Sequence, residues 1–300
     1  MNKIIILLFF FIFGSCSQTE ESDLKTNSPL GIQSFKIKQS WSQKPNGYER
    51  NVFYKYPEND NNINPVAILL HGAGGDAQIE ISEYNYLVNH ILVAPEGYDR
   101  SWNIAKETSK APDLDFIKKI ILELKTFEKV DSNQISIIGH SNGAALINQL
   151  LIELESESFK KAVFTFCQLN TLQYREGSFW ARSNINSELH DLEVLPASNN
   201  RKILSFAGTE DGACPYYGGE GIYKYNFVNA EQAAFIWAKV NGFKGVQIEN
   251  PVQGPENFYR FSYMNGKVIH YKLQGAGHGF EQNFDGREVS KPIIKNFIEN

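Results

Sequence analysis

In "ISIIGHSNGAAL", residues 135–146, strand-forming residues run into the turn G-H-S-N-G and then into small, helix-forming residues. A G-x-S-x-G match has value only when a strand precedes it and a helix follows it, and both are predicted here. A turn this sharp strains its serine and exposes the hydroxyl above the sheet. We therefore predict that Ser141 is a nucleophile; the alternative is a structural serine in a tight turn.

Further apolar runs lie at residues 66–70, 91–95, 162–166 and 203–207. Short runs that are apolar throughout are typical of parallel strands covered by helices on both faces. Between them, "DFIKKIILELKTFEK" repeats its apolar residues at helical spacing. Two amino-terminal segments, "IQSFKIKQ" and "YERNVFYKY", read as an antiparallel hairpin. We predict an α/β fold with a mostly parallel, doubly wound sheet, closed by a helix with Ser290 as its N-cap.

The amino terminus has the pattern of an export signal. Lys3 precedes ten apolar residues, 4–13, and Gly14 and Ser15 precede Cys16. Ten helical residues rise only about 15 Å, roughly half of a bilayer's hydrocarbon core, so a signal peptide over residues 1–15 is expected. Small residues before a cysteine resemble the lipobox of bacterial lipoproteins, which predicts lipidation at Cys16. A plain secretory signal and an uncleaved anchor are the alternatives.

Residues 16–31 are polar and acidic, as in a tether, and residues 32–300 are expected to form a single catalytic domain. The protein is then extracytoplasmic, held at a membrane only by its lipid anchor, with the outer membrane expected, or else secreted.

Composition excludes several classes of protein. The net charge of -5 over 300 residues, with no Lys/Arg run, argues against nucleic acid as a partner. No metal-ligand spacing, G-x-G-x-x-G or Walker A pattern is present, so no metal and no cofactor are predicted. Cys167 and Cys214 are too few for a disulfide framework, and the sequence leaves open whether they form one disulfide or remain buried thiols.

A nucleophilic serine needs a histidine base that a carboxylate orients. Of six histidines, His278 in "LQGAGHGF" follows a late predicted strand inside a glycine-rich turn. Asp211, with Glu210 as the alternative, directly follows the strand in "ILSFAGTEDGACPYYGG". The order Ser141, Asp211, His278 is the order of α/β-hydrolase triads.

Three other loops are expected at the carboxyl edge of the sheet. The loop of "AILLHGAGGD" follows the first apolar strand, and we predict that the backbone amides of Ala73 and Asn142 form an oxyanion hole. Residues 168–201 and 212–228 are aromatic loops that also follow strands, so Trp180, Tyr216 and Tyr217 are candidate substrate-binding residues. The alternative is that these aromatic side chains pack along surface loops.

Six motifs together resemble the polyhydroxybutyrate depolymerase and feruloyl esterase group of α/β-hydrolases, across residues 48–299: "LLHGAGGD", "VAPEGYDRSWN", "DLDFIKKII", "ISIIGHSNGAAL", "AGTEDGACPY" and "GAGHGF". The resemblance implies an extracytoplasmic serine esterase without a cofactor, with the triad and oxyanion residues named above. It also implies that Trp102, in "SWN", helps to shape the substrate side of the site, so Trp102 is a further candidate substrate-binding residue. Ala73 and Phe243 stand where family members often have cysteines, so the disulfides of those relatives are not carried over.

The expected reaction is hydrolysis of a carboxylic ester, on a polymer or its fragments, through an acyl-enzyme on Ser141. Removal of feruloyl or acetyl groups from polysaccharides is the leading expectation. Polyhydroxyalkanoate depolymerase and generic carboxylesterase are alternatives, followed by serine peptidase and a non-catalytic, glycan-binding lipoprotein.

Overall fold

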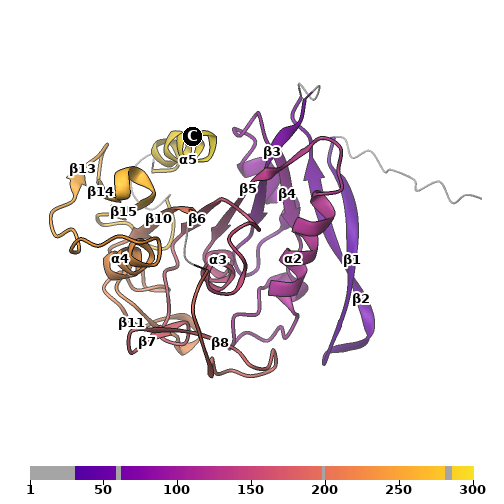
Figure 1. Ribbon diagram of the computed structural model, residues 1–300, viewed down its shortest axis with the longest axis horizontal. Coiled ribbons are helices and arrows are strands. Elements are labelled where there is room, and N and C mark those ends of the chain that lie inside the picture. The colour runs from indigo at the N-terminus through magenta and orange to yellow at the C-terminus, as the bar shows by residue number, and fades with distance from the viewer. Residues whose placement is uncertain (1–30, 59–61, 198–199, 281–285) are drawn as a thin grey trace, which may run out of the picture.

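The structure is a computed structural model that describes residues 31–58, 62–197, 200–280 and 286–300 (Figure 1). The predicted signal peptide, the lipidation site Cys16 and all but the last residue of the predicted tether lie outside the described residues. No helix in the described ranges is long and apolar enough to cross a bilayer.

One large sheet organises the molecule. Among the described residues its ten strands lie in the order β1-β2-β4-β3-β5-β6-β10-β15-β14-β13. Neighbouring strands from β4 to β15 run parallel, whereas β1, β2, β13 and β14 are antiparallel to their neighbours. The predicted parallel sheet and amino-terminal hairpin are therefore confirmed. The bounds are β1 (Gln33–Trp41), β2 (Lys44–Lys55), β3 (Asn64–Leu70), β4 (Ile91–Pro95), β5 (Val130–His140), β6 (Lys161–Thr165), β10 (Lys202–Gly208), β13 (Val252–Gln253), β14 (Phe258–Tyr263) and β15 (Val268–Leu273).

Helices cover both faces of this sheet (Figure 1). Their bounds are α1 (Ala77–Glu83), α2 (Asp113–Leu124), α3 (Asn142–Glu153), α4 (Ala230–Val240) and α5 (Gly286–Glu299). Helices α2, α3 and α4 share one buried apolar cluster with strand residues such as Ile68 and Ile137. Helices α1 and α5 share a second cluster with Leu69 and Ile138, the next residues along the same strands. Because successive strand side chains point to opposite faces, two helical layers enclose the sheet.

The carboxyl-terminal helix begins earlier than predicted. Helix α5 starts at Gly286, so Ser290 lies inside it and is 2% exposed, and its hydroxyl donates to the carbonyl of Arg287. The prediction of Ser290 as an N-cap was wrong, because a serine can bond to a carbonyl three residues back as well as cap a helix.

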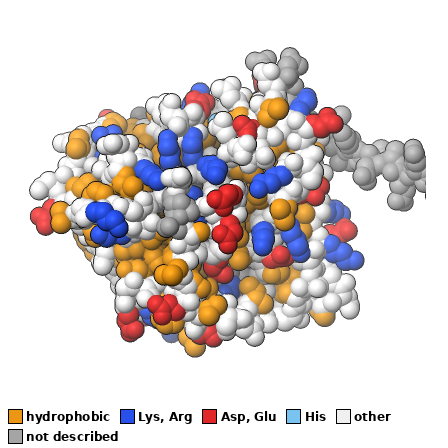
Figure 2. Space-filling model, in the orientation of Figure 1, with side chains coloured by type: hydrophobic (Ala, Val, Ile, Leu, Met, Phe, Trp, Pro, Cys, Tyr) orange, Lys and Arg blue, Asp and Glu red, His pale blue; other side chains and the backbone are white. Residues whose placement is uncertain are grey.

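The aromatic loops form small sheets of their own. The first contains β7 (Tyr174–Arg175), β8 (Ser178–Ala181) and β9 (Leu192–Val194), and β8 contacts α3. The second contains β11 (Gly219–Glu220) and β12 (Asn226–Phe227). A groove of about 600 Å³ runs between the first small sheet and α4, lined by apolar residues that include Val194, Leu195 and Ile236. Figure 2 shows hydrophobic side chains gathered over this part of the surface.

Candidate active site

The G-H-S-N-G turn joins β5 to α3. Ser141 lies between them with φ 51° and ψ -116°, a conformation that side-chain-bearing residues rarely adopt. Such strain costs about 1–3 kcal/mol and persists only where the surrounding structure enforces it. The amide of Ser141 donates to the carbonyl of Thr165, at the end of neighbouring β6, over 2.9 Å. The sheet therefore holds the serine in its strained position.

The two glycines of the turn are required by close packing. A Cβ atom at Gly143 would lie 2.3 Å from the carbonyl oxygen of Leu70, at the end of β3. A Cβ atom at Gly139 would lie 2.7 Å from the backbone of Gly143. The helix can start this close to the sheet only because neither position carries a side chain.

Ser141, His278 and Asp211 form one hydrogen-bonded chain. The Nε2 atom of His278 lies 2.8 Å from Oγ of Ser141, and its Nδ1 lies 2.8 Å from Oδ2 of Asp211. A carboxylate only accepts hydrogen bonds, so Nδ1 carries the proton and Nε2 presents its lone pair to the serine hydroxyl. His278 is 27% exposed at its side chain, whereas the side chain of Asp211 is fully buried.

The acidic residue is fixed by its own loop. The Oδ1 atom of Asp211 accepts hydrogen bonds from the amides of Ala213 and Cys214, each over 2.8 Å. The preceding amide, of Glu210, donates to the carbonyl of Ala276, which ties the loop to the one that carries His278. Glu210 is exposed. The structure therefore places Asp211, rather than the alternative Glu210, beside the histidine.

The loop after β3 lies against the serine. A Cβ atom at Gly72 would be 3.5 Å from Cβ of Ser141. The amide of Gly74 donates to the carbonyl of Arg100, and that of Gly75 donates to the carbonyl of Gly72. The amides of Ala73 and Asn142 have no acceptor within the described part of the chain. Asn142 also opens α3, where the first amides have no partner inside the helix and the helix dipole favours negative charge. Both amides are available to an oxyanion.

Trp102 does not contact substrate, as its 0% exposure rules out the predicted contact. Its indole N–H donates to the carbonyl of His71 over 2.8 Å, and its ring lies 4.8 Å from the imidazole of His71. His71 accepts in turn from the amide of Gly97 at Nε2. Trp102 therefore holds the loop after β3 through its hydrogen bond and ring contact with His71.

The side chain of Asn142 has a role that the sequence did not indicate. Its Oδ1 accepts from the amide of Trp102 over 2.7 Å, and its Nδ2 donates to the carbonyl of Trp102 and to Oε1 of Glu107. Glu107 is 3% exposed and also accepts from the hydroxyl of Tyr225. These hydrogen bonds join the start of α3 to residues 101–107. The "SWN" motif is the part of the sequence that could have pointed to them.

A cavity of about 200 Å³ lies beside His278. His140, Thr165, Tyr84, Phe280 and Glu80 are among its lining residues. Burial, together with the nearby His278, lowers the pKa of His140 to about 4, so this imidazole is neutral at neutral pH. Burial raises the pKa of Glu80 to about 7. At neutral pH the wall beside His278 thus carries no charge from His140 and about half a negative charge from Glu80.

The other predicted substrate-binding residues lie in different environments. Tyr216 is 1% exposed, and its hydroxyl donates to Glu231, so its predicted contact with substrate was wrong. Tyr217 is 64% exposed. Trp180 lies on β8 with the guanidinium of Arg175 4.0 Å from its ring centre, and it does not line the cavity beside His278. Many aromatic residues in these loops serve packing, which was the alternative interpretation.

Cys167 and Cys214, the two cysteines among the described residues, are buried free thiols. A hydrogen bond with Cys167, together with burial, holds the pKa of the Cys214 thiol well above its usual range. The core of this part of the molecule therefore contains two neighbouring thiols, and the Cys214 thiol is protonated at neutral pH.

One known protein is distantly similar in sequence, and several solved structures are similar in fold. Feruloyl esterase B of Piromyces equi is 24% identical over 183 residues, which is 60% of this chain and 31% of the relative. The match thus spans about a third of the relative's length. Esterase 2 of Thermogutta terrifontis, solved after phosphoramylation by tabun, has a TM-score of 0.55 and 13% identity over 89% of this chain and 94% of the other. Est1E from Butyrivibrio proteoclasticus has a TM-score of 0.52 and 13% identity, covering 88% and 97%.

An acylaminoacyl peptidase is also similar, with a TM-score of 0.54 and 15% identity over 90% of this chain and 41% of the peptidase. No protein-family model matches the chain. The sheet order, the serine between β5 and α3, and these similar structures show that the chain has the α/β-hydrolase fold.

Proposed function

We propose that the protein is a serine hydrolase that cleaves carboxylic esters through an acyl-enzyme on Ser141. The observation that carries this proposal is the continuous chain Ser141–His278–Asp211, with 2.8 Å at each link, beside two backbone amides that have no acceptor among the described residues. A fold supports many chemistries, so the proposal rests on this site rather than on the fold.

The geometry supports the following steps. His278 takes the proton of Ser141 as the hydroxyl oxygen attacks the ester carbonyl, and Asp211 keeps the imidazole oriented and stabilises its charged form. The amides of Ala73 and Asn142 stabilise the negative oxygen of the tetrahedral intermediate. His278 then returns the proton to the departing alcohol, and water releases the acid by the same route.

For the substrate, we propose feruloyl or acetyl esters on polysaccharides. The distant similarity to the feruloyl esterase of Piromyces equi and the motif resemblance support this choice. Polyhydroxyalkanoate depolymerase and generic carboxylesterase are the alternatives. We further propose that the enzyme is extracytoplasmic and anchored by lipid at Cys16, on the basis of the amino-terminal pattern alone.

The first test is hydrolysis of p-nitrophenyl acetate by the full-length chain in mild detergent, beside Ser141→Ala. We expect turnover by the native protein and a loss of several orders of magnitude in the variant. If the native protein is folded but as inactive as the variant, the proposal is contradicted and the non-catalytic, glycan-binding alternative is favoured. Comparing the rate of hydrolysis of methyl ferulate with that of suspended polyhydroxyalkanoate then distinguishes the two leading substrate classes.

A further inference from the structure

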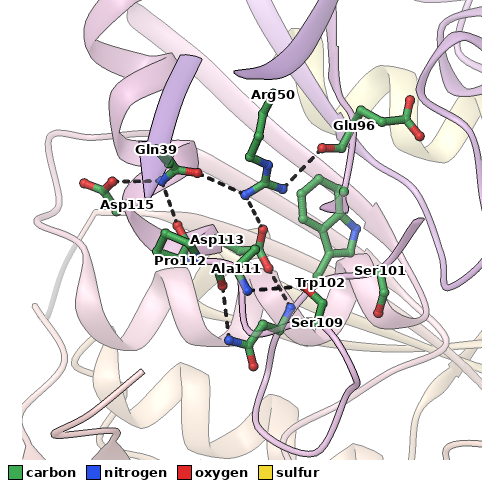
Figure 3. Close-up of polar contacts among 12 residues, drawn as sticks. Gln39, Arg50, Glu96, Ser101, Trp102, Ser109, Ala111, Pro112, Asp113 and Asp115 are labelled. Atoms are coloured by element: carbon green, nitrogen blue, oxygen red, sulfur yellow. Dashed lines mark hydrogen bonds and ion pairs between the residues drawn. The ribbon is translucent and has the colours of Figure 1, made fainter. Parts of the chain in front are cut away.

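A buried ion pair lies beside residues 102 and 103, which lie next to the candidate oxyanion hole. Figure 3 shows the Arg50 guanidinium, from β2, directed at the carboxylate of Asp113, the first residue of α2. The Nη1 atom of Arg50 lies 2.7 Å from Oδ1 of Asp113, and the two side chains are 1% and 0% exposed. Gln39 and the backbone carbonyl of Glu96 accept further hydrogen bonds from the same guanidinium.

A gain in folding stability is a weak explanation for a buried ion pair. Removing two charges from water is costly, and well-packed apolar residues of similar volume are often as stable or more stable. This pair is fully buried, and Nε of Arg50 has no hydrogen-bond partner among the described residues. The pair is therefore better explained by a geometry that apolar side chains cannot impose, since hydrogen bonds are directional.

The geometry concerns residues 101–103. The second oxygen of Asp113, Oδ2, accepts from the amide of Asn103 over 2.6 Å. The guanidinium also lies 3.7 Å from the ring centre of Phe116 and 5.9 Å from the ring of Trp102. The pair therefore fixes the backbone directly after Trp102 and one side of its indole ring.

Trp102 connects the ion pair to the segments that carry both candidate oxyanion donors. Its indole N–H bonds to His71, two residues before Ala73, and its backbone bonds to the side chain of Asn142 in both directions.

We infer that Arg50 and Asp113 are positioning residues for the oxyanion hole, acting through Trp102 on the amides of Ala73 and Asn142. The inference rests on the proposed serine-esterase function. Neither side chain touches the reacting atoms. A displacement of about 1 Å near the reacting atoms costs on the order of 100-fold in rate, and one oxyanion donor contributes about 100- to 1,000-fold.

The test replaces the pair with apolar residues, Arg50→Met with Asp113→Leu, in the full-length chain. We expect kcat for p-nitrophenyl acetate to fall about 10- to 100-fold, with KM changing less than about 2-fold. A phenyl trifluoromethyl ketone, which adds to the serine and places its oxygen in the oxyanion hole, supplies a second measurement. Its inhibition constant is expected to rise by the same factor as kcat falls.

The matched control removes an exposed ion pair from the same hairpin. Lys36 and Glu49 pair across β1 and β2 at 3.2 Å, each 58% exposed at its side chain. Lys36→Gln with Glu49→Gln should leave kcat, KM and the inhibition constant unchanged.

Two results for the double variant would overturn the inference. One is a cooperatively unfolding variant with native kcat and inhibition constant. The other is a lower kcat with a native inhibition constant, which means a smaller active fraction and only a structural role. If the double variant does not fold, the isosteric Asp113→Asn is measured in the same way, because its amide nitrogen must face either Arg50 or the amide of Asn103. Native protein that neither hydrolyses the ester nor binds the ketone instead removes the proposed function itself, and the inference with it.

Discussion

Oγ of Ser141 and Nε2 of His278 lie 2.8 Å apart although 137 residues separate them in the sequence. The serine is held at the end of β5 by the turn it belongs to, and the histidine by a loop after β15, two strands beyond β6. Parallel strands end at one edge of the sheet, so residues from distant segments meet there.

The carboxylate of Asp211 should be required for orientation of His278. In Asp211→Asn, the amide oxygen can still accept from the amides of Ala213 and Cys214, so the amide nitrogen faces Nδ1 of His278. The histidine must then carry its proton on Nε2, which cannot accept from the serine. We expect kcat to fall by roughly 10⁴-fold with little loss of stability, as measured by ester kinetics and thermal unfolding.

Glu210→Gln is the control for this substitution, because Glu210 is the neighbouring acid and is exposed. Its kcat should stay native. A large loss in Glu210→Gln together with an active Asp211→Asn would reverse the assignment.

Replacing Ser141 with glycine should relieve the backbone strain at this position, and the relief should be measurable as a gain in stability. With φ 51° and ψ -116°, glycine is far better suited to this position than alanine. Both Ser141→Gly and Ser141→Ala should be inactive, but Ser141→Gly should exceed Ser141→Ala by about 1 kcal/mol in free energy of unfolding. Equal denaturation midpoints for the two variants would show that the turn stores no such strain.

The contact between α3 and β3 should not tolerate a methyl group at Gly143. Gly143→Ala places Cβ 2.3 Å from the carbonyl oxygen of Leu70, so the helix must shift. We expect a loss of about 2–3 kcal/mol in unfolding free energy together with most of the activity. Gly212→Ala is the comparison, because a Cβ atom there meets nothing within 4 Å and should change stability by less than about 0.5 kcal/mol. Similar losses in both variants would contradict the packing argument.

Acid should destabilise the protein through its buried histidines. Burial lowers the pKa of His270 to about 3, so the folded protein keeps this residue neutral where the unfolded chain, with a pKa near 6.5, takes up a proton. Its contribution to stability is complete above about pH 6.5 and is lost as the pH falls toward 3. Between pH 6.5 and 5 the expected loss is roughly 2 kcal/mol from this residue.

Urea unfolding at pH 7 and pH 5 measures the effect. His270→Gln, which cannot titrate in this range, should show a smaller fall in unfolding free energy than the native protein. An identical fall in both proteins would mean that His270 does not contribute.

Local sequence was sufficient for the features that depend on neighbouring residues. The strand, the two glycines and the small residues around Ser141 indicate the tight turn because the change from strand to helix occurs within consecutive residues, although the atom that excludes a side chain at Gly143 belongs to Leu70 on β3. The parallel strands were likewise visible as short apolar runs, since burial on both faces leaves no alternation. The amides of Ala73 and Asn142 could be named because each belongs to a local motif.

Features that depend on packing between distant segments needed the tertiary structure. The sequence presented Asp211 and Glu210 as adjacent acids, and only the approach of the His278 loop distinguishes them. Tyr216 was predicted to contact substrate because aromatic residues after a strand suit both a pocket and a core, and Trp102 because the family resemblance implied it. Both are buried because distant partners, His71 and Glu231, accept hydrogen bonds from their polar atoms. Composition and periodicity determine which surfaces must be buried, whereas the register between distant strands and helices decides which atoms meet.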